Sequence, residues 1–158
     1  MKGIKFLSLV ILITTSIGLS AQTTRIEWLS FEQLEDSLAK KPKKVFVSFY
    51  TDWCVYCKKM EKVAYKDPEI IAQLNSEYYA VKMDAETTET IVFDGQKFEN
   101  KEYGKKRNAV HEIPLLLASR EGRPFSLPAI VLLDESFRVT QRHFEYLSPK
   151  KMLKLLKY

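Results

Sequence analysis

Cysteine is scarce in this chain of 158 residues, which carries only Cys54 and Cys57. Two cysteines exclude a scaffold held together by several disulfides, and they exclude a zinc site built from four cysteines. Glycine and proline are also few, with 5 and 6 copies, so the composition is neither collagen-like nor typical of a disordered chain. At this length, with 46% hydrophobic residues, we expect one ordinary domain with its own core.

No stretch of a single charge sign dominates the sequence. The formal net charge is +5, but the 25 Lys and Arg residues are interleaved with 20 Asp and Glu residues. Nucleic-acid-binding proteins concentrate their basic residues on one face or along one helix. We therefore expect no nucleic-acid partner, and we interpret the basic cluster from Lys101 to Arg107 as a solvated face.

Long apolar runs are missing except close to the N-terminus. Two lysines precede a mostly apolar run over 6–19, and small residues occupy positions 20 and 21. This order is typical of a secretory signal peptide, and the run is shorter than the roughly 20 residues that span a bilayer. We expect 1–21 to be a signal peptide and 22–158 to be a periplasmic or secreted domain without a membrane span. An uncleaved N-terminal anchor is the alternative.

The rest of the sequence alternates between helix and strand patterns, which predicts an α/β fold with a central mixed β-sheet covered by helices. Helices are expected over about 30–40, 54–65, 67–75 and 102–119, with a closing helix from 148. Strands are expected over 45–50, 78–83, 90–93, 96–98, 129–133 and 139–146.

Local signals mark where several of these elements begin or turn. Three helices are predicted to start at typical capping sequences, namely Ser30 with Gln33, Asp67-Pro68 and Ser148-Pro149. Asp94-Gly95 predicts a two-residue turn between the strands of a hairpin. Pro114 is expected to break or restart the helix over 102–119.

The two cysteines are separated by two residues, as Cys54-Val55-Tyr56-Cys57. This spacing occurs in zinc sites, haem attachment sites and redox-active dithiols. Haem attachment requires a histidine directly after the second cysteine, where this chain has Lys58. A zinc site would need both His111 and His143, at spacings that match no familiar ligand set. A structural disulfide over so short a loop would stabilise the fold by only about 2 kcal/mol. Redox chemistry is therefore favoured, with a zinc clamp and a structural clip as open alternatives.

The place of the cysteine pair in the chain supports redox chemistry. The pair directly follows a predicted buried strand and lies at the first turn of a predicted helix. There the helix dipole and the unpaired N–H groups stabilise a thiolate. We expect Cys54 to be the exposed nucleophile, and Cys57, one turn further along, to resolve the mixed disulfide.

The segment 45–58, VFVSFYTDWCVYCK, resembles the strand and active site of thioredoxin-like proteins. Together with Met60-Glu61-Lys62 and Asp67-Pro68-Glu69, it is similar to the periplasmic C-terminal thioredoxin-like domain of the membrane disulfide reductase that feeds electrons into the bacterial envelope. Small secreted thioredoxin-like proteins share this stretch. The resemblance implies a thioredoxin-like fold and thiol–disulfide exchange, and it implies no metal and no organic cofactor.

The resemblance also implies which residues meet a substrate. Family members carry a cis proline before a strand, facing the active site, and Leu127-Pro128 fits that mark. Leu127 and Pro128 are then expected to hold the substrate backbone by strand-like pairing. Trp53 and Tyr56 are expected to flank the dithiol and to contact the substrate.

The sequence departs from the family pattern in two places. Family members usually carry a buried aspartate, a proton acceptor for the second cysteine, where this chain has Ser48. A hydroxyl cannot fill that role at neutral pH. The segment 86–124 is longer than the matching region of a minimal thioredoxin, and we interpret it as an insertion that shapes the partner surface.

The sequence therefore predicts a secreted thiol–disulfide oxidoreductase that reduces protein disulfides through Cys54 and Cys57. The two residues between the cysteines bring no fixed positive charge and no imidazole, which favours a reductant over a strong oxidant. An upstream thiol protein must then supply the electrons. A disulfide oxidase or isomerase is the alternative enzyme, and a non-catalytic binding module with the same fold is the alternative from another class.

Overall fold

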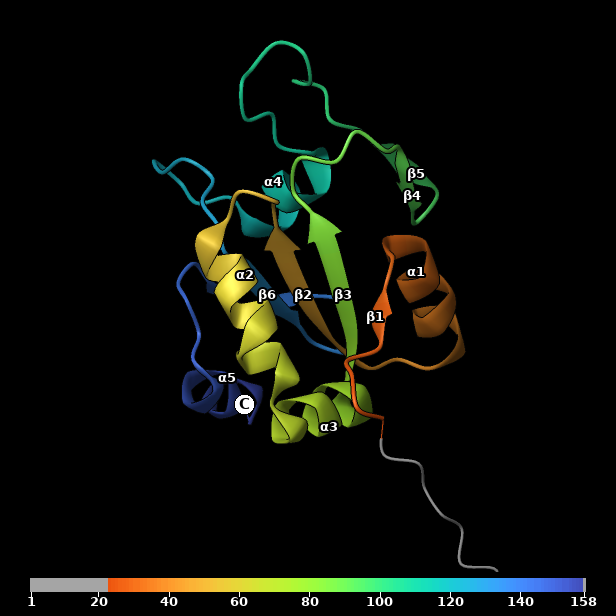
Figure 1. The fold of residues 1–158 in the computed structure, drawn as a ribbon. Coiled ribbons are helices and arrows are strands. Elements are labelled where there is room, and N and C mark those ends of the chain that lie inside the picture. The colour runs from red at the N-terminus through yellow and green to blue at the C-terminus, as the bar shows by residue number, and fades with distance from the viewer. Residues whose placement is uncertain (1–22, 158) are drawn as a thin grey trace, which may run out of the picture.

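The computed structural model describes residues 23–157, so the signal peptide expected at 1–21 lies outside the described residues. Five strands form one sheet in the order β1-β3-β2-β6-β7 (Figure 1). Their bounds are β1 Trp28–Leu29, β2 Lys44–Tyr50, β3 Tyr78–Asp84, β6 Ala129–Leu133 and β7 Val139–His143. The strands β1, β3 and β2 are parallel, whereas β6 runs antiparallel to β2 and β7 antiparallel to β6. The predicted mixed sheet is confirmed.

Helices cover both faces of this sheet. Their bounds are α1 Phe31–Lys40, α2 Val55–Lys62, α3 Pro68–Glu77, α4 Glu112–Ala118 and α5 Pro149–Leu156, with a short 3-10 helix, η1 Ala64–Lys66, between α2 and α3. The helices α2, α3 and α5 lie on one face, and α1 and α4 lie on the other (Figure 1). The three predicted capping sequences are confirmed, because Ser30, Asp67 and Ser148 each accept a backbone N–H bond at a helix start.

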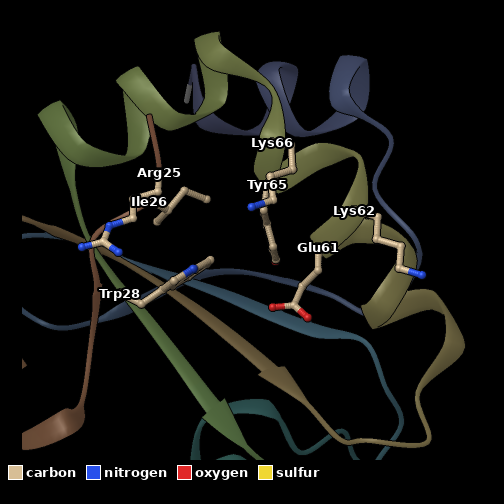
Figure 2. Close-up of a pocket in the computed structure, with 7 residues that line it drawn as sticks. All are labelled: Arg25, Ile26, Trp28, Glu61, Lys62, Tyr65 and Lys66. Carbon is tan, nitrogen blue, oxygen red and sulfur yellow. The ribbon is translucent and has the colours of Figure 1, made fainter. Parts of the chain in front are cut away.

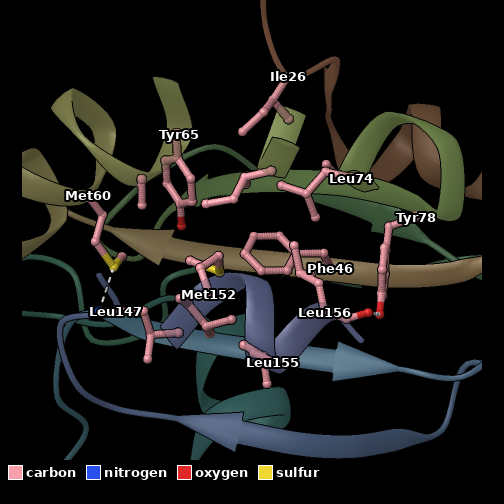
Figure 3. Packing of buried hydrophobic residues seen from close by; sticks show 14 of the residues in the cluster. Ile26, Phe46, Met60, Tyr65, Leu74, Tyr78, Leu147, Met152, Leu155 and Leu156 are labelled. Atoms are coloured by element: carbon pink, nitrogen blue, oxygen red, sulfur yellow. Dashed lines mark hydrogen bonds between the residues drawn. The ribbon is translucent and has the colours of Figure 1, made fainter. Parts of the chain in front are cut away.

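The core on the α2 face is built around Phe46 of the central strand β2 (Figure 3). Met60 of α2, Leu74 of α3 and Met152 of α5 belong to the same buried cluster. Burying each such side chain stabilises the fold by about 1.5–3 kcal/mol. The N–H of Leu147 also donates to the Met60 sulfur at 3.4 Å. This packing holds α2, and with it the cysteine pair, against the sheet.

A second cluster fills the opposite face of the same strands. Val45, Val47 and Phe49 alternate along β2 with Phe46 of the first cluster and the buried Ser48, as strand geometry requires. They pack together with buried side chains from α1 and α4. The residues of β2 are therefore buried on both faces, which explains why its sequence is an almost continuous apolar run.

The predicted hairpin is confirmed, with strands β4 Ile91–Phe93 and β5 Gln96–Phe98. Both residues of its turn, Asp94 and Gly95, have positive φ angles, 52° and 67°. Such turns match the twist of the flanking strands, which is why Asp-Gly is favoured there. The ring of Phe93 meets Phe31 of α1 edge to face, with 5.6 Å between ring centroids. The hairpin thus packs against α1 at the edge of the domain.

The helix predicted over 102–119 is wrong in its first half. The residues before Glu112 form turns, and only α4 is helical. Gly104 adopts a φ of 77°, in the left-handed region that interrupts a helix. Pro114 lies in the first turn of α4, where no backbone N–H is needed, so it starts a short helix instead of breaking a long one.

Three further elements differ from the prediction. The helix α2 ends at Lys62 and continues only as the 3-10 turn η1, and β7 ends at His143 instead of position 146. The strand β1 has no counterpart in the sequence-based expectation, because two residues are too few to show a period. Within 23–157, no helix is both long and apolar enough to cross a membrane.

Candidate active site

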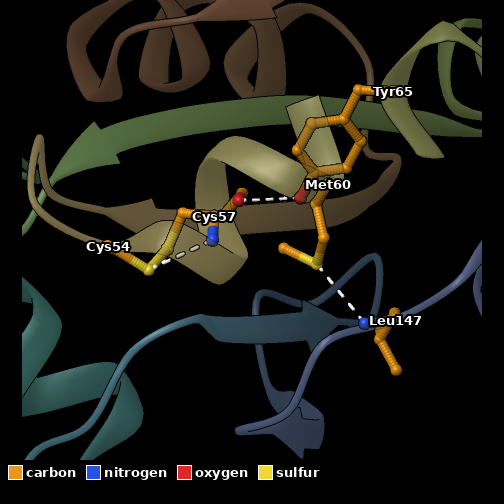
Figure 4. The surroundings of a disulfide bond; sticks show 6 residues. Cys54, Cys57, Met60, Tyr65 and Leu147 are labelled. Atoms are coloured by element: carbon orange, nitrogen blue, oxygen red, sulfur yellow. Dashed lines mark hydrogen bonds between the residues drawn. A yellow bond between two sulfur atoms is a disulfide. The ribbon is translucent and has the colours of Figure 1, made fainter. Parts of the chain in front are cut away.

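The cysteine pair lies directly beyond the C-terminal end of β2. Cys54 and Cys57 form a disulfide with 5.3 Å between their Cα atoms (Figure 4). A turn over 51–53 connects the strand to the pair, and the N–H of Cys54 bonds to the carbonyl of Thr51 at 3.1 Å. The strand and α2 are both fixed by the core, so the disulfide is held at the rim of the sheet.

Cys54 is the N-cap residue of α2, as its predicted place at the first turn requires. The backbone N–H of Cys57 donates to the Cys54 sulfur at 3.2 Å. A reduced Cys54 would keep this donor, together with the positive end of the helix dipole. Both favour the thiolate over the thiol. This geometry is consistent with Cys54 as the nucleophile of the pair, a role that stays a prediction.

The expectation that Cys54 is exposed is wrong for the disulfide-bonded protein. The exposed fraction is 4% for Cys54 and 5% for Cys57, so exposure does not distinguish the two sulfurs. The exposed surface next to the sulfurs belongs instead to the neighbouring aromatic side chains: Trp53 is 58% exposed and Tyr56 is 59% exposed. A substrate that approaches the two sulfurs would meet these exposed rings, which is consistent with the predicted substrate contacts.

The two exposed aromatic residues are held from different directions. Trp53 donates from its indole nitrogen to the carboxylate of Glu86 at 3.1 Å. The ring centroid of Tyr56 lies 6.3 Å from that of Tyr146, which follows β7. Trp53 is therefore tied to the insertion, and Tyr56 to the opposite side of the site.

The Leu127–Pro128 peptide bond is cis, as the resemblance implies. It directly precedes β6, whose Ala129 pairs with Phe49 near the end of β2. This register brings the Leu127–Pro128 loop to the same end of the sheet as the disulfide. The substrate contact expected of these two residues stays a prediction.

A buried pair of hydroxyl groups occupies the place where family members carry an aspartate. The Ser48 and Tyr65 hydroxyls are 2.8 Å apart, and both side chains are buried. Tyr65 lies in η1, and Figure 4 shows its hydroxyl end on the side of Cys57. Burial raises the pKa of Tyr65 well above its usual value. Both hydroxyls therefore stay protonated at neutral pH, and neither supplies an anionic proton acceptor.

Charged groups surround Tyr65 on its other side. A cavity of about 400 Å³, which we call the α2 cavity, is lined by Arg25, Ile26, Trp28, Glu61, Lys62, Tyr65 and Lys66 (Figure 2). Glu61 forms an ion pair with Lys82, whose ammonium lies 4.3 Å from the centre of the Tyr50 ring. Lys82 pairs in register with Ser48 on the neighbouring strand, so both belong to the α2 face. A carboxylate is thus present near the hydroxyl pair, but it is already engaged by a cation.

Neither histidine belongs to the site. His111 is fully buried: its Nδ1 accepts the N–H of Ile113 at 3.2 Å, and its Nε2 donates to the carbonyl of Phe98 at 3.1 Å. Burial lowers the pKa of His111, which keeps the ring neutral. His143 lies in β7 and hydrogen-bonds to Gln141 at 3.1 Å. Within 23–157, no group of three or more His, Cys, Asp or Glu side chains is arranged to hold a metal ion.

Three residues of the site escape prediction from the sequence. Tyr65 and Glu86 act through partners 17 and 33 positions away in the chain, and no local pattern indicates such pairings. Thr51 directly follows the buried strand and is itself buried, but a lone threonine carries no signal. Only the departure at Ser48 points to this region, because it raises the question of what replaces the carboxylate.

Comparison with known sequences identifies the family. A model of the thioredoxin-like domain matches residues 31–158. The thiol:disulfide interchange protein DsbD of Vibrio vulnificus is 42% identical over 60 residues, which are 34% of this chain and 10% of DsbD. DsbD of Haemophilus ducreyi is 46% identical over 46 residues, which are 28% of this chain and 8% of DsbD. The matched part thus spans about a tenth or less of these relatives.

Solved structures share the fold at low sequence identity. DsbH oxidoreductase superposes with a TM-score of 0.58 at 16% identity, covering 98% of this chain and 92% of its own. A thioredoxin from Thermus thermophilus superposes with a TM-score of 0.56 at 20% identity, covering 84% of this chain and 85% of its own. The family match covers most of the chain, and the two cysteines stand at disulfide distance. The chain therefore belongs to the thioredoxin-like family of thiol–disulfide oxidoreductases.

Proposed function

We propose that this protein is a reductase of protein disulfides in the periplasm or outside the cell. The observation that carries the proposal is the position of Cys54 at the N-cap of α2, with the Cys57 N–H directed at its sulfur. That arrangement stabilises a nucleophilic thiolate beside exposed aromatic side chains that offer a contact surface. Both redox partners in the reaction are then thiol proteins.

The reaction follows from the two sulfur atoms. In the reduced protein, the Cys54 thiolate attacks one sulfur of a substrate disulfide, and the other substrate sulfur leaves as a thiolate. Cys57 then attacks the Cys54 sulfur of this mixed disulfide and releases the second substrate thiol. The substrate gains two electrons and two protons, and the Cys54–Cys57 disulfide forms. An upstream dithiol protein must return two electrons before the next turnover.

The second step requires that Cys57 lose its proton. The Ser48 and Tyr65 hydroxyls cannot accept the proton of Cys57 as a carboxylate would. We therefore expect slow deprotonation of Cys57 near neutral pH. Ser48→Asp should change the pH–rate profile and speed turnover near neutrality, whereas Ser48→Ala should not. An unchanged profile in Ser48→Asp would show that this position does not limit the chemistry.

The reductive direction is supported by the charges around Cys54. Val55 and Tyr56, between the cysteines, are uncharged, and both histidines hydrogen-bond elsewhere. Thiolate stabilisation then comes mainly from the helix terminus, which favours a low potential over that of a strong oxidant.

The deciding experiment is equilibration with graded ratios of reduced and oxidised glutathione, followed by thiol labelling. We expect one two-electron transition with a potential nearer to about −270 mV than to about −120 mV. A value close to −120 mV would make the protein an oxidase. A disulfide that stays oxidised at every ratio would make it a structural clip in a binding module.

The cellular location rests on the pattern of residues 1–21. A charged start, a short apolar run and small residues at the exit support export and cleavage after Ala21. Mass spectrometry of the protein from the producing cell should find a chain that starts at Gln22. An intact Met1 in a membrane fraction would instead support the uncleaved anchor.

A further inference from the structure

The outer side of α2 carries cations that no carboxylate neutralises. Lys58, Lys59 and Lys62 are exposed there, and none of them takes part in an ion pair within the described residues. The only acidic side chain of α2, Glu61, is paired with Lys82, and Figure 2 shows it leaving the helix in a different direction from Lys62. Charges of both signs are interleaved along the whole sequence, but the structure gathers only cations on this side of the helix.

The helical period explains why these lysines share one side of α2. Cys57 and Met60 are its buried residues, so they define the side that faces the core. At about 3.6 residues per turn, four exposed positions of the helix fall opposite to them. We call these residues the α2 outer face: Val55, Lys58, Lys59 and Lys62.

The arrangement of charges on the α2 outer face is unfavourable for the helix by itself. Lys58 and Lys62 are four residues apart, and Lys59 and Lys62 are three apart, so like charges are neighbours on the helix surface. The Lys59 ammonium lies 4.6 Å from the centre of the Tyr146 ring, a contact that orders the side chain but leaves its charge in place. Carboxylates of a bound partner would relieve the repulsion. The face is therefore complementary to an acidic surface.

Exposed apolar side chains adjoin the same face. Of the eight large apolar side chains that are exposed in the described part of the chain, four lie between positions 53 and 63. Val55 is 74% exposed, and Val63, directly after α2, is 43% exposed. Exposed apolar groups bordered by charged ones are typical of a protein–protein interface. The α2 outer face therefore fits a polypeptide better than a small anion.

The α2 outer face begins at the reactive pair. Val55 lies between the two cysteines, and Lys62 is about 8 Å beyond Cys57 along the helix axis. In Figure 1, α2 runs from the C-terminal end of β2 along the outside of the sheet. A polypeptide that presents a disulfide sulfur to Cys54 can extend along α2 and place further residues against the lysines. These contacts are separate from those expected of the cis-proline loop.

We propose that the α2 outer face binds an acidic segment of the polypeptide whose disulfide Cys54 attacks. The carboxylates of that segment pair with Lys58, Lys59 and Lys62, while Val55 packs against residues next to the disulfide. Attraction between the opposite charges speeds the encounter and weakens as salt screens it. An anionic membrane is a poorer fit, because a bilayer lying on this face would block access to the dithiol. The proposal rests on the proposed function and names the charge of the substrate that the site prefers.

The test measures how fast three disulfide-bridged peptides oxidise the reduced protein. The peptides differ only in a short segment beyond the disulfide, which consists of glutamates, glutamines or lysines. In low salt, we expect a second-order rate constant about tenfold higher for the glutamate peptide than for the glutamine peptide, and the lowest rate for the lysine peptide. At about 0.5 M salt the glutamate-to-glutamine ratio should fall to about twofold or less, because the ions screen the attraction.

Two double variants locate the effect. Lys59→Glu/Lys62→Glu should invert the order, so that the lysine peptide reacts faster than the glutamate peptide. Lys41→Glu/Lys97→Glu changes the net charge equally, but its positions follow α1 and lie in β5, so it should keep the wild-type order. Both peptides react with the same thiol, so any change in the reactivity of Cys54 cancels in the ratio.

Either of two results with these variants would overturn the proposal: an unchanged order in Lys59→Glu/Lys62→Glu, or an inverted order in both double variants. If Lys59→Glu/Lys62→Glu does not fold by circular dichroism, Lys59→Gln/Lys62→Gln replaces it. That variant should lower the glutamate-to-glutamine ratio by about threefold or more. An unchanged ratio there would overturn the proposal equally.

A small uncharged disulfide, bis(2-hydroxyethyl) disulfide, separates this proposal from the proposed function. A wild-type protein that reduces it but treats the three peptides alike retains its function and lacks the site for an acidic segment. A protein that reduces neither this disulfide nor the peptides lacks the proposed function itself. Sedimentation with vesicles of phosphatidylcholine and phosphatidylglycerol is the last measurement. Vesicle binding that Lys59→Glu/Lys62→Glu abolishes, together with equal peptide rates, would assign the face to a membrane surface instead.

Discussion

The α2 cavity and a second pocket differ more in chemistry than in size. The second pocket lies beside Trp53, is lined largely by the insertion, and is called the insertion pocket. They measure about 400 Å³ and 340 Å³. The α2 cavity is lined largely by charged side chains, and its hydroxyl, that of Tyr65, is already bonded to Ser48. The insertion pocket has mainly apolar walls, and its hydroxyl, that of Thr51, has no partner in the described part of the chain.

This difference shows that volume alone does not identify a binding site. A hydroxyl that is satisfied within the protein gains little from a ligand, since it would exchange one hydrogen bond for another. An unsatisfied hydroxyl gains a bond that it lacks. The Ser48–Tyr65 hydroxyls are therefore satisfied inside the protein, whereas the Thr51 hydroxyl is equally buried but has no partner in the described part of the chain.

The largest effect is expected from substitution of the two cysteines. Cys54→Ser should abolish disulfide exchange, because no other thiol is placed at the N-cap of α2. Cys57→Ser should instead accumulate mixed disulfides through Cys54, which non-reducing electrophoresis detects. Mixed disulfides in Cys54→Ser and none in Cys57→Ser would reverse the two roles.

The next largest effect is expected from breaking the Ser48–Tyr65 hydroxyl pair. Tyr65→Phe leaves the Ser48 hydroxyl buried without its partner, so the free energy of unfolding should fall by about 1–3 kcal/mol. Urea denaturation measures this change. Tyr56→Phe is the matched control, because Tyr56 is exposed and its hydroxyl reaches solvent. A loss in Tyr65→Phe no larger than in the control would mean that the hydroxyl pair contributes nothing to stability.

A pH-dependent change in stability is expected from His111, which lies in the insertion. Burial lowers the pKa of His111, so its folded-state pKa lies below the unfolded value of about 6.5. The stability it contributes is complete above about pH 6.5 and is lost as the pH falls toward the folded-state pKa. The melting temperature should therefore drop between pH 7.5 and pH 5, and His111→Gln should reduce that drop.

His143→Gln serves as the control for this experiment. His143 lies in β7, away from the insertion, so its substitution should leave the drop caused by His111 in place. If the two variants respond alike to pH, His111 is not the group that titrates.

The smallest effect is a change in stability expected at Thr51, the hydroxyl without a partner. Thr51→Val replaces a buried, unpaired hydroxyl by a methyl group of similar shape, so the protein without substrate should gain about 1 kcal/mol of stability. Urea denaturation of the reduced and the oxidised protein measures the gain. A loss of similar size would mean that the hydroxyl is paired after all.

Much of the fold follows from short-range signals. The capping sequences at Ser30, Asp67 and Ser148 each act within four residues, and the Asp94-Gly95 turn specifies its hairpin locally. The first half of the helix expected over 102–119 fails for a related reason. Gly104 takes a left-handed backbone conformation, and Asn100 ties the loop together by bonds to the carbonyls of Glu86 and Ala109. Loop closure of this kind leaves no periodic trace.

The sequence by itself determined the reactive pair, the strand before it and the family, because these depend on adjacent residues and on a motif that is contiguous in the chain. The tertiary structure decided which hydroxyl is paired and which is free. Ser48 meets Tyr65 only because η1 folds back over β2, and Trp53 meets Glu86 only because β3 ends beside the disulfide. Such pairings depend on how separate elements pack, and packing brings together residues that the sequence keeps apart.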